Sequence, residues 1–244
     1  MVARTVAVVS GCPDTGPAIA RHFASLGDAV GLLVAGDPAP AEGVRWTAPL
    51  DLSGGAVAAD GPLDDLVAAL GDPHVLVSVP VPGFGVSLLR SDPDQLTDHL
   101  DASIGLAFRA ARRLAPAMVK ARQGRIVVVT GIVALVGAGW ESMHGSAMAG
   151  LIGMSRSLAR ELAPAGVTVN VVAAGAIETS HLQEVAASSR GAKVVEATVA
   201  RTPIRRLGTV DDVAFAVEHL ASADAGYLNG VVLPVDGGLG MGFS

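Results

Sequence analysis

The chain has 244 residues, of which 50% are hydrophobic and 16% charged, and its net charge at pH 7 is −6. High hydrophobicity with low charge excludes a disordered chain, and this length can bury a large core without disulfides or metals. The acidic balance argues against a nucleic-acid-binding surface.

A single cysteine, Cys12, excludes an internal disulfide framework and favours a reducing compartment. The charge-free run from Ile126 to Trp140 is shorter than the ~20 residues that span a bilayer. The apolar start, Thr5–Val9, is too short for the hydrophobic region of a signal peptide. We therefore expect a cytoplasmic protein that binds neither nucleic acid nor membrane.

Short runs rich in Val, Ile and Leu alternate with Ala- and Leu-rich stretches along the whole chain. Strands of a parallel sheet have such near-continuous apolar runs, because helices cover both faces of the sheet. In chain order the sequence predicts strand Thr5–Ser10, helix Pro17–Leu26, strand Ala29–Val34, strand Gly43–Leu50, helix Leu63–Leu70, strand His74–Val79, helix Pro93–Arg122, strand Arg125–Thr130, helix Ser142–Leu162, strand Val167–Val172, helix Val210–Leu220 and strand Val231–Val235.

This alternation predicts an α/β fold with a parallel sheet between two layers of helices. The stretch Gly36–Gly43 is proline-rich and too short for a crossover helix, so the second unit of the alternation is shortened there. No linker or shift in composition marks a second domain. We expect residues 1–244 to form a single domain.

The first strand leads into the turn Ser10-Gly11-Cys12-Pro13-Asp14-Thr15-Gly16-Pro17, which a helix follows. A glycine-rich turn at this place is where a dinucleotide-binding fold holds a pyrophosphate. Glycine lets the backbone approach the phosphates, and the helix N-terminus attracts their charge. The glycine pattern is incomplete here, so the turn alone leaves nucleotide binding open.

The second half of the chain carries several short motifs in a fixed order. They are Gly124–Val129, Ala149–Gly153, Ser157–Leu162, Val167–Val172, Gly175–Thr179, Arg206–Gly208, Leu220–Ser222 and Val235–Gly238. With them the chain resembles the short-chain dehydrogenase/reductase family, close to its 3-oxoacyl carrier-protein reductase branch. The resemblance implies a single Rossmann-type domain, a three-layer sandwich with a seven-stranded sheet. It also implies a tetramer and NAD(P)-dependent carbonyl or alcohol chemistry.

The catalytic residues of that family do not recur at the matching positions. Aligned on the flanking motifs, Met148 stands at the position of the family's lysine, His144 at that of its tyrosine and Gly131 at that of its serine. Ser103 stands at the position of the helix asparagine. In the family the tyrosine protonates the substrate carbonyl, and the lysine lowers the tyrosine's pKa and holds the ribose. Met148 can do neither.

Three side chains remain as catalytic candidates. His144 could exchange a proton, since imidazole titrates near neutral pH, or it could simply form part of a pocket wall. Thr130, beside Gly131, and Ser103 could supply hydrogen bonds to a substrate oxygen, or they could be structural hydroxyls.

The cofactor positions of the family are also altered. Gly11 and Gly16 match the first and last glycines of a phosphate loop that is one residue shorter than usual, and Asp14 replaces the middle glycine. A carboxylate there repels a pyrophosphate and obstructs its approach to the backbone. At the end of the fourth predicted strand, Ser78–Val81 replaces the family's Asn-Asn-Ala-Gly, and Pro80 lacks an N–H donor.

Other cofactor positions are retained. Asp51 matches the adenine-side aspartate, and Gly175, Ile177 and Thr179 match the loop that meets the nicotinamide. These residues, with Gly11 and Gly16, are the cofactor-binding candidates if a dinucleotide binds. The fold alone could also require them. We expect no binding of NAD(P), or weak binding.

The remaining polar clusters carry weaker signals. A basic cluster of Arg201, Arg205 and Arg206 could hold a phosphate of an acyl carrier or coenzyme A, or it could be a solvated surface. Trp140 and Glu141 precede His144 and could line or fill a substrate pocket. The histidines show no metal-ligand spacing, so no metal site is expected. They are His22, His74, His99, His144, His181 and His219.

Three functions fit these observations. The chain could be a catalytically silent subunit that pairs with an active reductase-like subunit. It could be a non-redox enzyme (a lyase, isomerase or cyclase) that uses His144, or an atypical NAD(P)-dependent oxidoreductase with His144 as proton donor. A small-molecule or acyl substrate fits either enzyme. The helices within Leu96–Arg122 and Ser142–Leu162 match the family's dimer surface and are rich in small residues, which predicts a homo- or hetero-oligomer.

Overall fold

The computed structural model describes residues 4–36, 38, 41–83 and 85–241. Its centre is one parallel sheet in the order β3-β2-β1-β4-β5-β6-β7, which confirms the predicted seven-stranded Rossmann-type fold. The strands are β1 (Thr5–Ser10), β2 (Ala29–Ala35), β3 (Trp46–Leu50), β4 (Val75–Val79), β5 (Gly124–Gly131), β6 (Val167–Ala174) and β7 (Val232–Val235).

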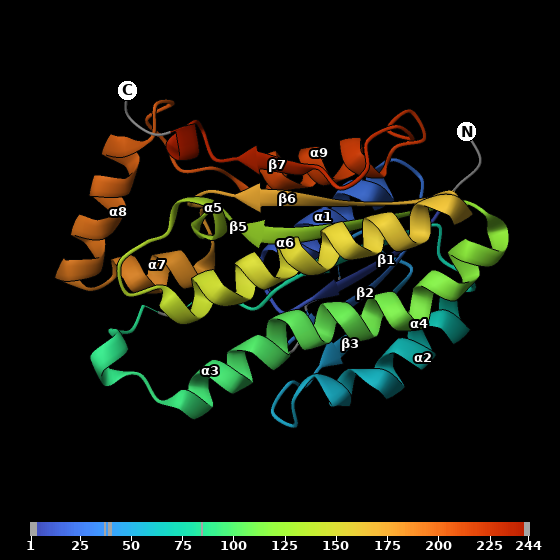
Figure 1. The fold of residues 1–244 in the computed structure, drawn as a ribbon, viewed down its shortest axis with the longest axis horizontal. Helices are drawn as coiled ribbons and strands as arrows, with labels where there is room; N and C mark the ends of the chain where they lie inside the picture. Colours follow the sequence, from blue (N-terminus) through green and yellow to red (C-terminus); the bar gives the residue numbers. More distant parts are fainter. Residues whose placement is uncertain (1–3, 37, 39–40, 84, 242–244) are drawn as a thin grey trace.

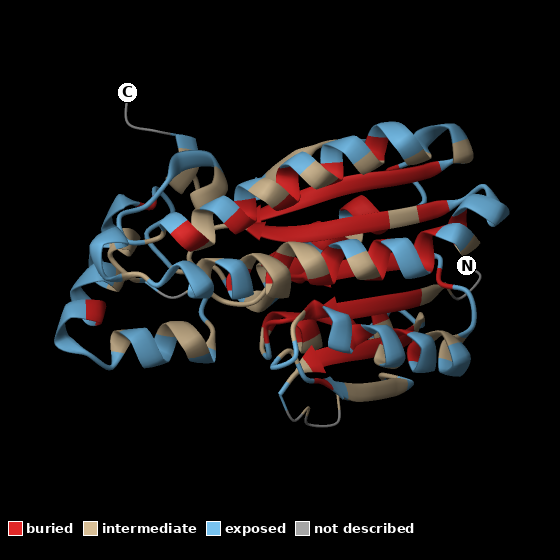
Figure 2. Cartoon of the chain, turned by 60° about the horizontal axis from the view of Figure 1, so that its bottom comes forward, coloured by how far each residue is buried: buried red, intermediate tan, exposed pale blue. Residues whose placement is uncertain are grey.

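Helices cover both faces of this sheet (Figure 1). One face packs against α1 (Thr15–Ser25) and α9 (Val210–Ala221). The other packs against α2 (Asp60–Leu70), α4 (Leu106–Ala121) and α6 (Ser142–Leu162). The five central strands β1, β2, β4, β5 and β6 are buried almost throughout, as Figure 2 shows, because each lies between two apolar layers. The edge strands β3 and β7 are only partly buried.

The long helix predicted over Pro93–Arg122 is interrupted. It consists of α3 (Pro93–Leu100), a π-helical turn (Asp101–Gly105) and α4. The carboxylate of Asp101 accepts a hydrogen bond from the N–H of Ala56 at 2.6 Å, which ties this turn to a neighbouring loop. Single π-turns of this kind occur where a helix must place a side chain out of its regular phase.

Three helices were not predicted from the sequence: α5 (Val133–Val136), α7 (Ser180–Ala186) and α8 (Ser189–Arg201). Thr179 and Ser188 cap the last two through their side-chain oxygens. The predicted strand Gly43–Leu50 begins later, at Trp46. Part of the proline-rich stretch Gly36–Gly43 lies outside the described residues, and the described part of it contains no helix.

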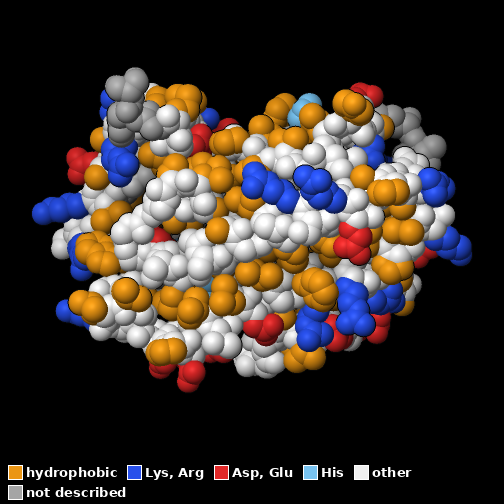
Figure 3. Space-filling view, in the orientation of Figure 1, with side chains coloured by type: hydrophobic (Ala, Val, Ile, Leu, Met, Phe, Trp, Pro, Cys, Tyr) orange, Lys and Arg blue, Asp and Glu red, His pale blue; other side chains and the backbone are white. Residues whose placement is uncertain are grey.

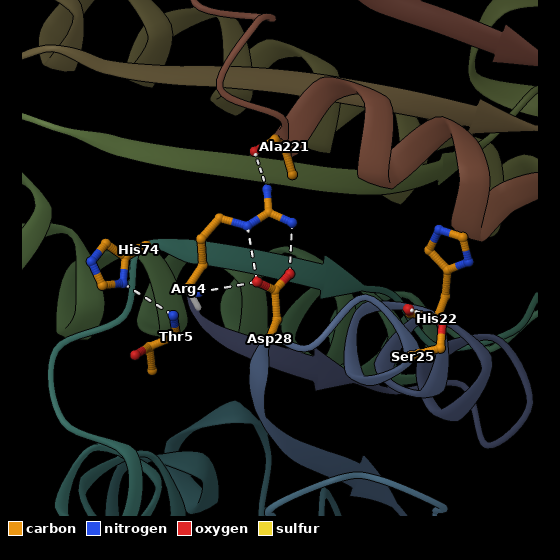
Figure 4. A network of polar contacts seen from close by, with 7 residues as sticks. All are labelled: Arg4, Thr5, His22, Ser25, Asp28, His74 and Ala221. Carbon is orange, nitrogen blue, oxygen red and sulfur yellow. Dashed lines mark hydrogen bonds and ion pairs between the residues drawn. The ribbon is translucent and has the colours of Figure 1, made fainter. Parts of the chain in front are cut away.

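A polar clamp closes the amino ends of the strands (Figure 4). Arg4 donates from its backbone N–H and its guanidinium to the carboxylate of Asp28, and also to the carbonyl oxygen of Ala221 at the end of α9. The N–H of Thr5 donates to Nδ1 of His74. These contacts join β1, the start of β2, the start of β4 and α9 at the edge away from the cavity described below.

Candidate functional site

A cavity of about 940 Å³ opens at the carboxyl ends of β4, β5 and β6, and residues of α7 and α8 also line it. This is the edge where open α/β sheets bind their ligands. Its walls are mostly apolar, with a few polar side chains. Of the catalytic and cofactor-binding candidates, those that line it are Thr130, His144, Gly175, Ile177 and Thr179; the lining does not include Ser103, Gly11, Gly16 or Asp51.

Two histidines from different helices meet beside this cavity. Nδ1 of His144, on α6, lies 3.1 Å from Nε2 of His99, on α3. Nε2 of His144 lies 3.5 Å from the point where a Cβ on Gly131 would stand, at the end of β5. His99 therefore holds one nitrogen of the His144 ring, and the other is directed toward the carboxyl end of the sheet.

Burial, with the nearby His99 and His181, lowers the pKa of His144 to about 4. Burial also lowers the pKa of His99. A positive charge is costly where the ring is removed from water and other imidazoles lie close by. At neutral pH both rings of this pair are therefore uncharged.

Glu141 immediately precedes α6 and lines the same cavity. Its Oε2 is shielded from solvent and has no hydrogen-bond partner. Burial raises the pKa of this carboxyl, and the nearby His181 opposes part of that effect. Gly83 lies against both groups. A Cβ there would be 2.6 Å from Cγ of His144 and 3.0 Å from Oε2 of Glu141, so only glycine allows this approach.

Trp140 joins the loop before α6 to two other segments. Its backbone has a φ of +64°, in the left-handed region that a tryptophan rarely adopts. Its carbonyl oxygen accepts the N–H of Val86 at 2.9 Å, and the guanidinium carbon of Arg190 lies 3.9 Å from the centre of its ring. The cation–π contact connects α8 to the cavity wall.

The other two catalytic candidates are placed differently. The hydroxyl of Thr130 donates to the carbonyl oxygen of Met148 at 3.1 Å, and Met148 is completely buried. Ser103 is buried in the π-helical turn, and its hydroxyl has no hydrogen-bond partner. In this structure, Thr130 therefore supports packing between β5 and α6.

The glycine-rich turn is held by its own side chains. Oγ of Ser10 accepts the N–H of Cys12 at 3.0 Å. The carboxylate of Asp14 accepts the N–H and the hydroxyl of Ser180, at 3.2 and 2.7 Å, which connects this turn to the start of α7. A Cβ on Gly16 would lie 2.3 Å from Cβ of Ser10, so helix–strand packing alone requires this glycine.

The remaining cofactor candidates make local contacts. Asp51 is exposed and accepts the N–H of Ser53, and this hydrogen bond lowers its pKa. A Cβ on Gly175 would lie 2.8 Å from Cα of Asp236. Ile177 forms a β-bridge with Gly208, and Thr179 caps α7. Each of these residues thus has a contact that the fold uses.

The three arginines of the predicted basic cluster have different surroundings. Arg206 forms an exposed ion pair with Asp212, Arg205 donates to the carbonyl oxygen of Ala200, and Arg201 lines the cavity. Among the described residues, no group of three or more His, Cys, Asp or Glu side chains is placed to hold a metal ion. None of the helices that they form is long and apolar enough to cross a membrane.

Sequence reasoning missed the role of His99 in this site. It lies 45 residues before His144, and only the packing of α3 against α6 brings the rings together. No spacing in the sequence carries that signal. Trp140 and Glu141 were recognised as wall candidates, but their contacts with Arg190 and Gly83 depend on the loops.

Comparison with known proteins gives consistent results. A family model described as enoyl-(acyl carrier protein) reductase matches residues 15–240. The chain is 36% identical, over 99% of its length and 91% of the relative's, to 3-oxoacyl-[acyl-carrier-protein] reductase MabA of Mycobacterium avium. It is 36% identical to the Escherichia coli reductase FabG over 73% of this chain and 71% of that one.

Among solved structures, the chain is similar to ligand-free aldohexose dehydrogenase of Thermoplasma acidophilum. The TM-score is 0.89 over 99% of this chain and 95% of that one, with 23% sequence identity. At this identity the likeness concerns the fold alone.

Proposed function

Because the chain belongs to the short-chain dehydrogenase/reductase family, we propose that it is a member without hydride transfer, a catalytically silent subunit beside an active oxidoreductase of the same fold. The buried Met148 carries this proposal. It stands where the family's lysine would hold the ribose, yet its side chain is packed in the core and its carbonyl oxygen accepts the hydroxyl of Thr130. A thioether has neither charge nor proton to offer there.

The phosphate loop does not fit a dinucleotide either. The N–H of Cys12, which could face a phosphate, is already bound to Oγ of Ser10. Asp14 places a carboxylate between the turn and Ser180, where a pyrophosphate would add like charge. We expect binding of NAD(P) to be absent or weak, and no step is assigned to it.

The outer face of α4 and α6 is the proposed assembly surface. Hydrophobic side chains lie scattered over it, and Lys and Arg side chains lie on it as well as toward α2 (Figure 3). Phe108 and Val119 on α4 are exposed, and Gly153 on α6 has open space around it. A homotetramer or a complex with a reductase-like subunit would cover this surface. The relatives' names point to an acyl substrate for such a partner.

One observation favours a second function. His144 is held by His99 beside an open cavity, which a subunit with only a structural role would not need. A non-redox enzyme (a lyase, isomerase or cyclase) would use this pair. An atypical NAD(P)-dependent oxidoreductase with His144 as proton donor has less support, because its low pKa leaves little imidazolium at neutral pH.

Co-expression with a reductase of the same organism that keeps the family's Tyr-x-x-x-Lys tests the pairing. We expect native mass spectrometry to find both chains in one oligomer, and NADPH-dependent reduction of acetoacetyl-CoA to require the partner. Gly153→Arg should yield smaller species, whereas Gly61→Arg, on the open side of α2, should not. Gly150 is unsuitable, since a Cβ there would lie 2.5 Å from Ile104 within the same chain.

Hydride transfer by the purified chain alone would contradict the silent role. A wild-type chain that is monomeric by analytical ultracentrifugation, with and without the reductase, would contradict the pairing.

A further inference from the structure

We propose that Glu141 and His144 form a proton-transfer site that enolises a carbonyl compound with an apolar body, and so moves a β,γ double bond into conjugation with the carbonyl. This inference deepens the second function above and rests on the absence of hydride transfer. It requires no dinucleotide, metal or other co-reactant.

Enolisation requires a base for the α proton and a hydrogen-bond donor for the carbonyl oxygen, and Glu141 and His144 can supply one each. His144 is uncharged, and if His99 donates to its Nδ1, its own proton is on Nε2. That N–H is a hydrogen-bond donor for a carbonyl oxygen. Glu141 is a carboxyl removed from water, with one oxygen unpartnered and its pKa raised, which makes it a stronger base than an exposed glutamate. A carboxylate base beside a neutral imidazole is an arrangement that isomerases use.

The distances place His144 and Glu141 against the same residue, Gly83. Gly83 brings the backbone of the loop after β4 onto the His144 ring and onto Oε2 of Glu141, both within 3.0 Å of the position of its missing Cβ. Gly131, at the family's serine position, leaves space beside Nε2 of His144. A carbonyl oxygen can therefore approach that nitrogen from the cavity, with its α carbon on the side of Glu141.

The reaction balances within these groups. Glu141 removes a proton from the α carbon, and the electron pair of the broken C–H bond forms a dienolate whose oxygen accepts the Nε2–H of His144. The carboxyl then returns the proton to the γ carbon. The double bond moves from the β,γ to the α,β position, and both side chains regain their starting states.

The rest of the cavity suits such a substrate. Val133, Val185 and Val194 contribute apolar wall, and burial around Glu141 keeps water from stabilising its carboxylate. Besides His99 on α3, the titratable or charged side chains that share the cavity with the pair are Cys12, Arg90, His181 and Glu184 on α7, and Arg190 and Arg201 on α8.

The test uses the full chain and the N-acetylcysteamine thioester of trans-hex-3-enoic acid in D₂O, followed by proton NMR. We expect conversion to the conjugated thioester without added dinucleotide. Deuterium enters the γ carbon only in those turnovers in which the Glu141 carboxyl exchanges its proton with D₂O before returning it. Glu141→Gln should lower the rate by about 10²–10⁴, the usual share of a general base. Glu161→Gln, the same change on the exposed far end of α6, should leave it unchanged.

His99 is a positioning residue in this account, and its variants are read by a second measurement. We expect ¹⁵N NMR of the wild type to show His144 with its proton on Nε2. His99→Phe should give a mixture of tautomers and a slower isomerisation. His99→Gln, whose amide can still donate, should restore both.

Wild-type protein that is folded by circular dichroism yet neither isomerises the thioester nor exchanges its α protons above the buffer rate would overturn the proposal. A rate unaffected by Glu141→Gln would overturn it too. Neither of these negative results bears on the absence of hydride transfer, which is contradicted only if the chain alone oxidises NADPH.

Discussion

The two edges of the sheet use their polar residues in opposite ways. At the amino edge, Arg4 and Asp28 are bound to each other and to the end of α9, and the Asp28 side chain is only 6% exposed. At the carboxyl edge, Glu141 leaves a buried oxygen without a partner and Trp140 adopts a left-handed backbone. Paired groups stabilise a fold, whereas unpaired and strained ones cost stability and are kept where a ligand binds. The comparison rests on the charged groups, because the buried hydroxyls of Ser103, Ser155 and Thr168 also lack partners and Arg122, before β5, has a left-handed backbone as well.

The largest expected effect is at the carboxyl edge. If the chain turns over a substrate by itself, His144→Ala should reduce turnover by about 10²–10⁴, because it removes the donor to the substrate oxygen. His219→Ala, an exposed histidine on α9, is the matched control. If the chain is only a silent subunit, the activity of the complex should be unchanged by His144→Ala and lost without the partner. An isolated chain that is active and indifferent to His144→Ala would mean that the site lies elsewhere.

At the amino edge the expected effect is on stability alone. Asp28→Ala should lower the free energy of unfolding by about 2–4 kcal/mol, because it leaves the part-buried guanidinium of Arg4 without its carboxylate. Urea unfolding measures this, with the exposed Asp224→Ala as control. If Asp28→Ala changed ligand binding or turnover while the protein stayed folded, the two edges would not have the separate roles described here.

The architecture could be predicted from the sequence, because buried strands have nearly continuous apolar runs such as Val6–Val9 and Ile126–Val129. The helices α7 and α8 could not, since both are mostly exposed and bury only Gly191. The π-helical turn was missed because helical periodicity continues through it, and only the backbone of Asp101–Gly105 shows it.

The site was predictable only in part. His144 was singled out by its position in a motif, and it does line the cavity. His99 and Gly83, which contact His144, come from other segments of the chain. No local sequence pattern indicates that these residues lie close together. The roles of Thr130 and Ser103 in chemistry stay predictions.

A smaller effect is expected from pH. The unfolded chain protonates His144 near its ordinary pKa of 6.5, whereas the folded state holds it neutral down to about 4. Between these values the unfolded state binds more protons, so acidification should destabilise the protein, by about 1–2 kcal/mol for a part-exposed group. The raised pKa of Glu141 acts in the opposite sense, since its folded form favours the proton. Urea unfolding at pH 7 and pH 4 should show a weaker acid loss in His144→Gln and a stronger one in Glu141→Gln.

The central claim is that this chain has the fold of its family but does not bind a dinucleotide. Calorimetric titration with NADH and NADPH tests this claim most directly. We expect no binding tighter than a Kd of about 1 mM. Asp14→Gly should improve it little, because Met148 and the segment Ser78–Val81 also lack the family's contacts. A Kd of about 10 μM or better for either dinucleotide, about −7 kcal/mol, would contradict the account.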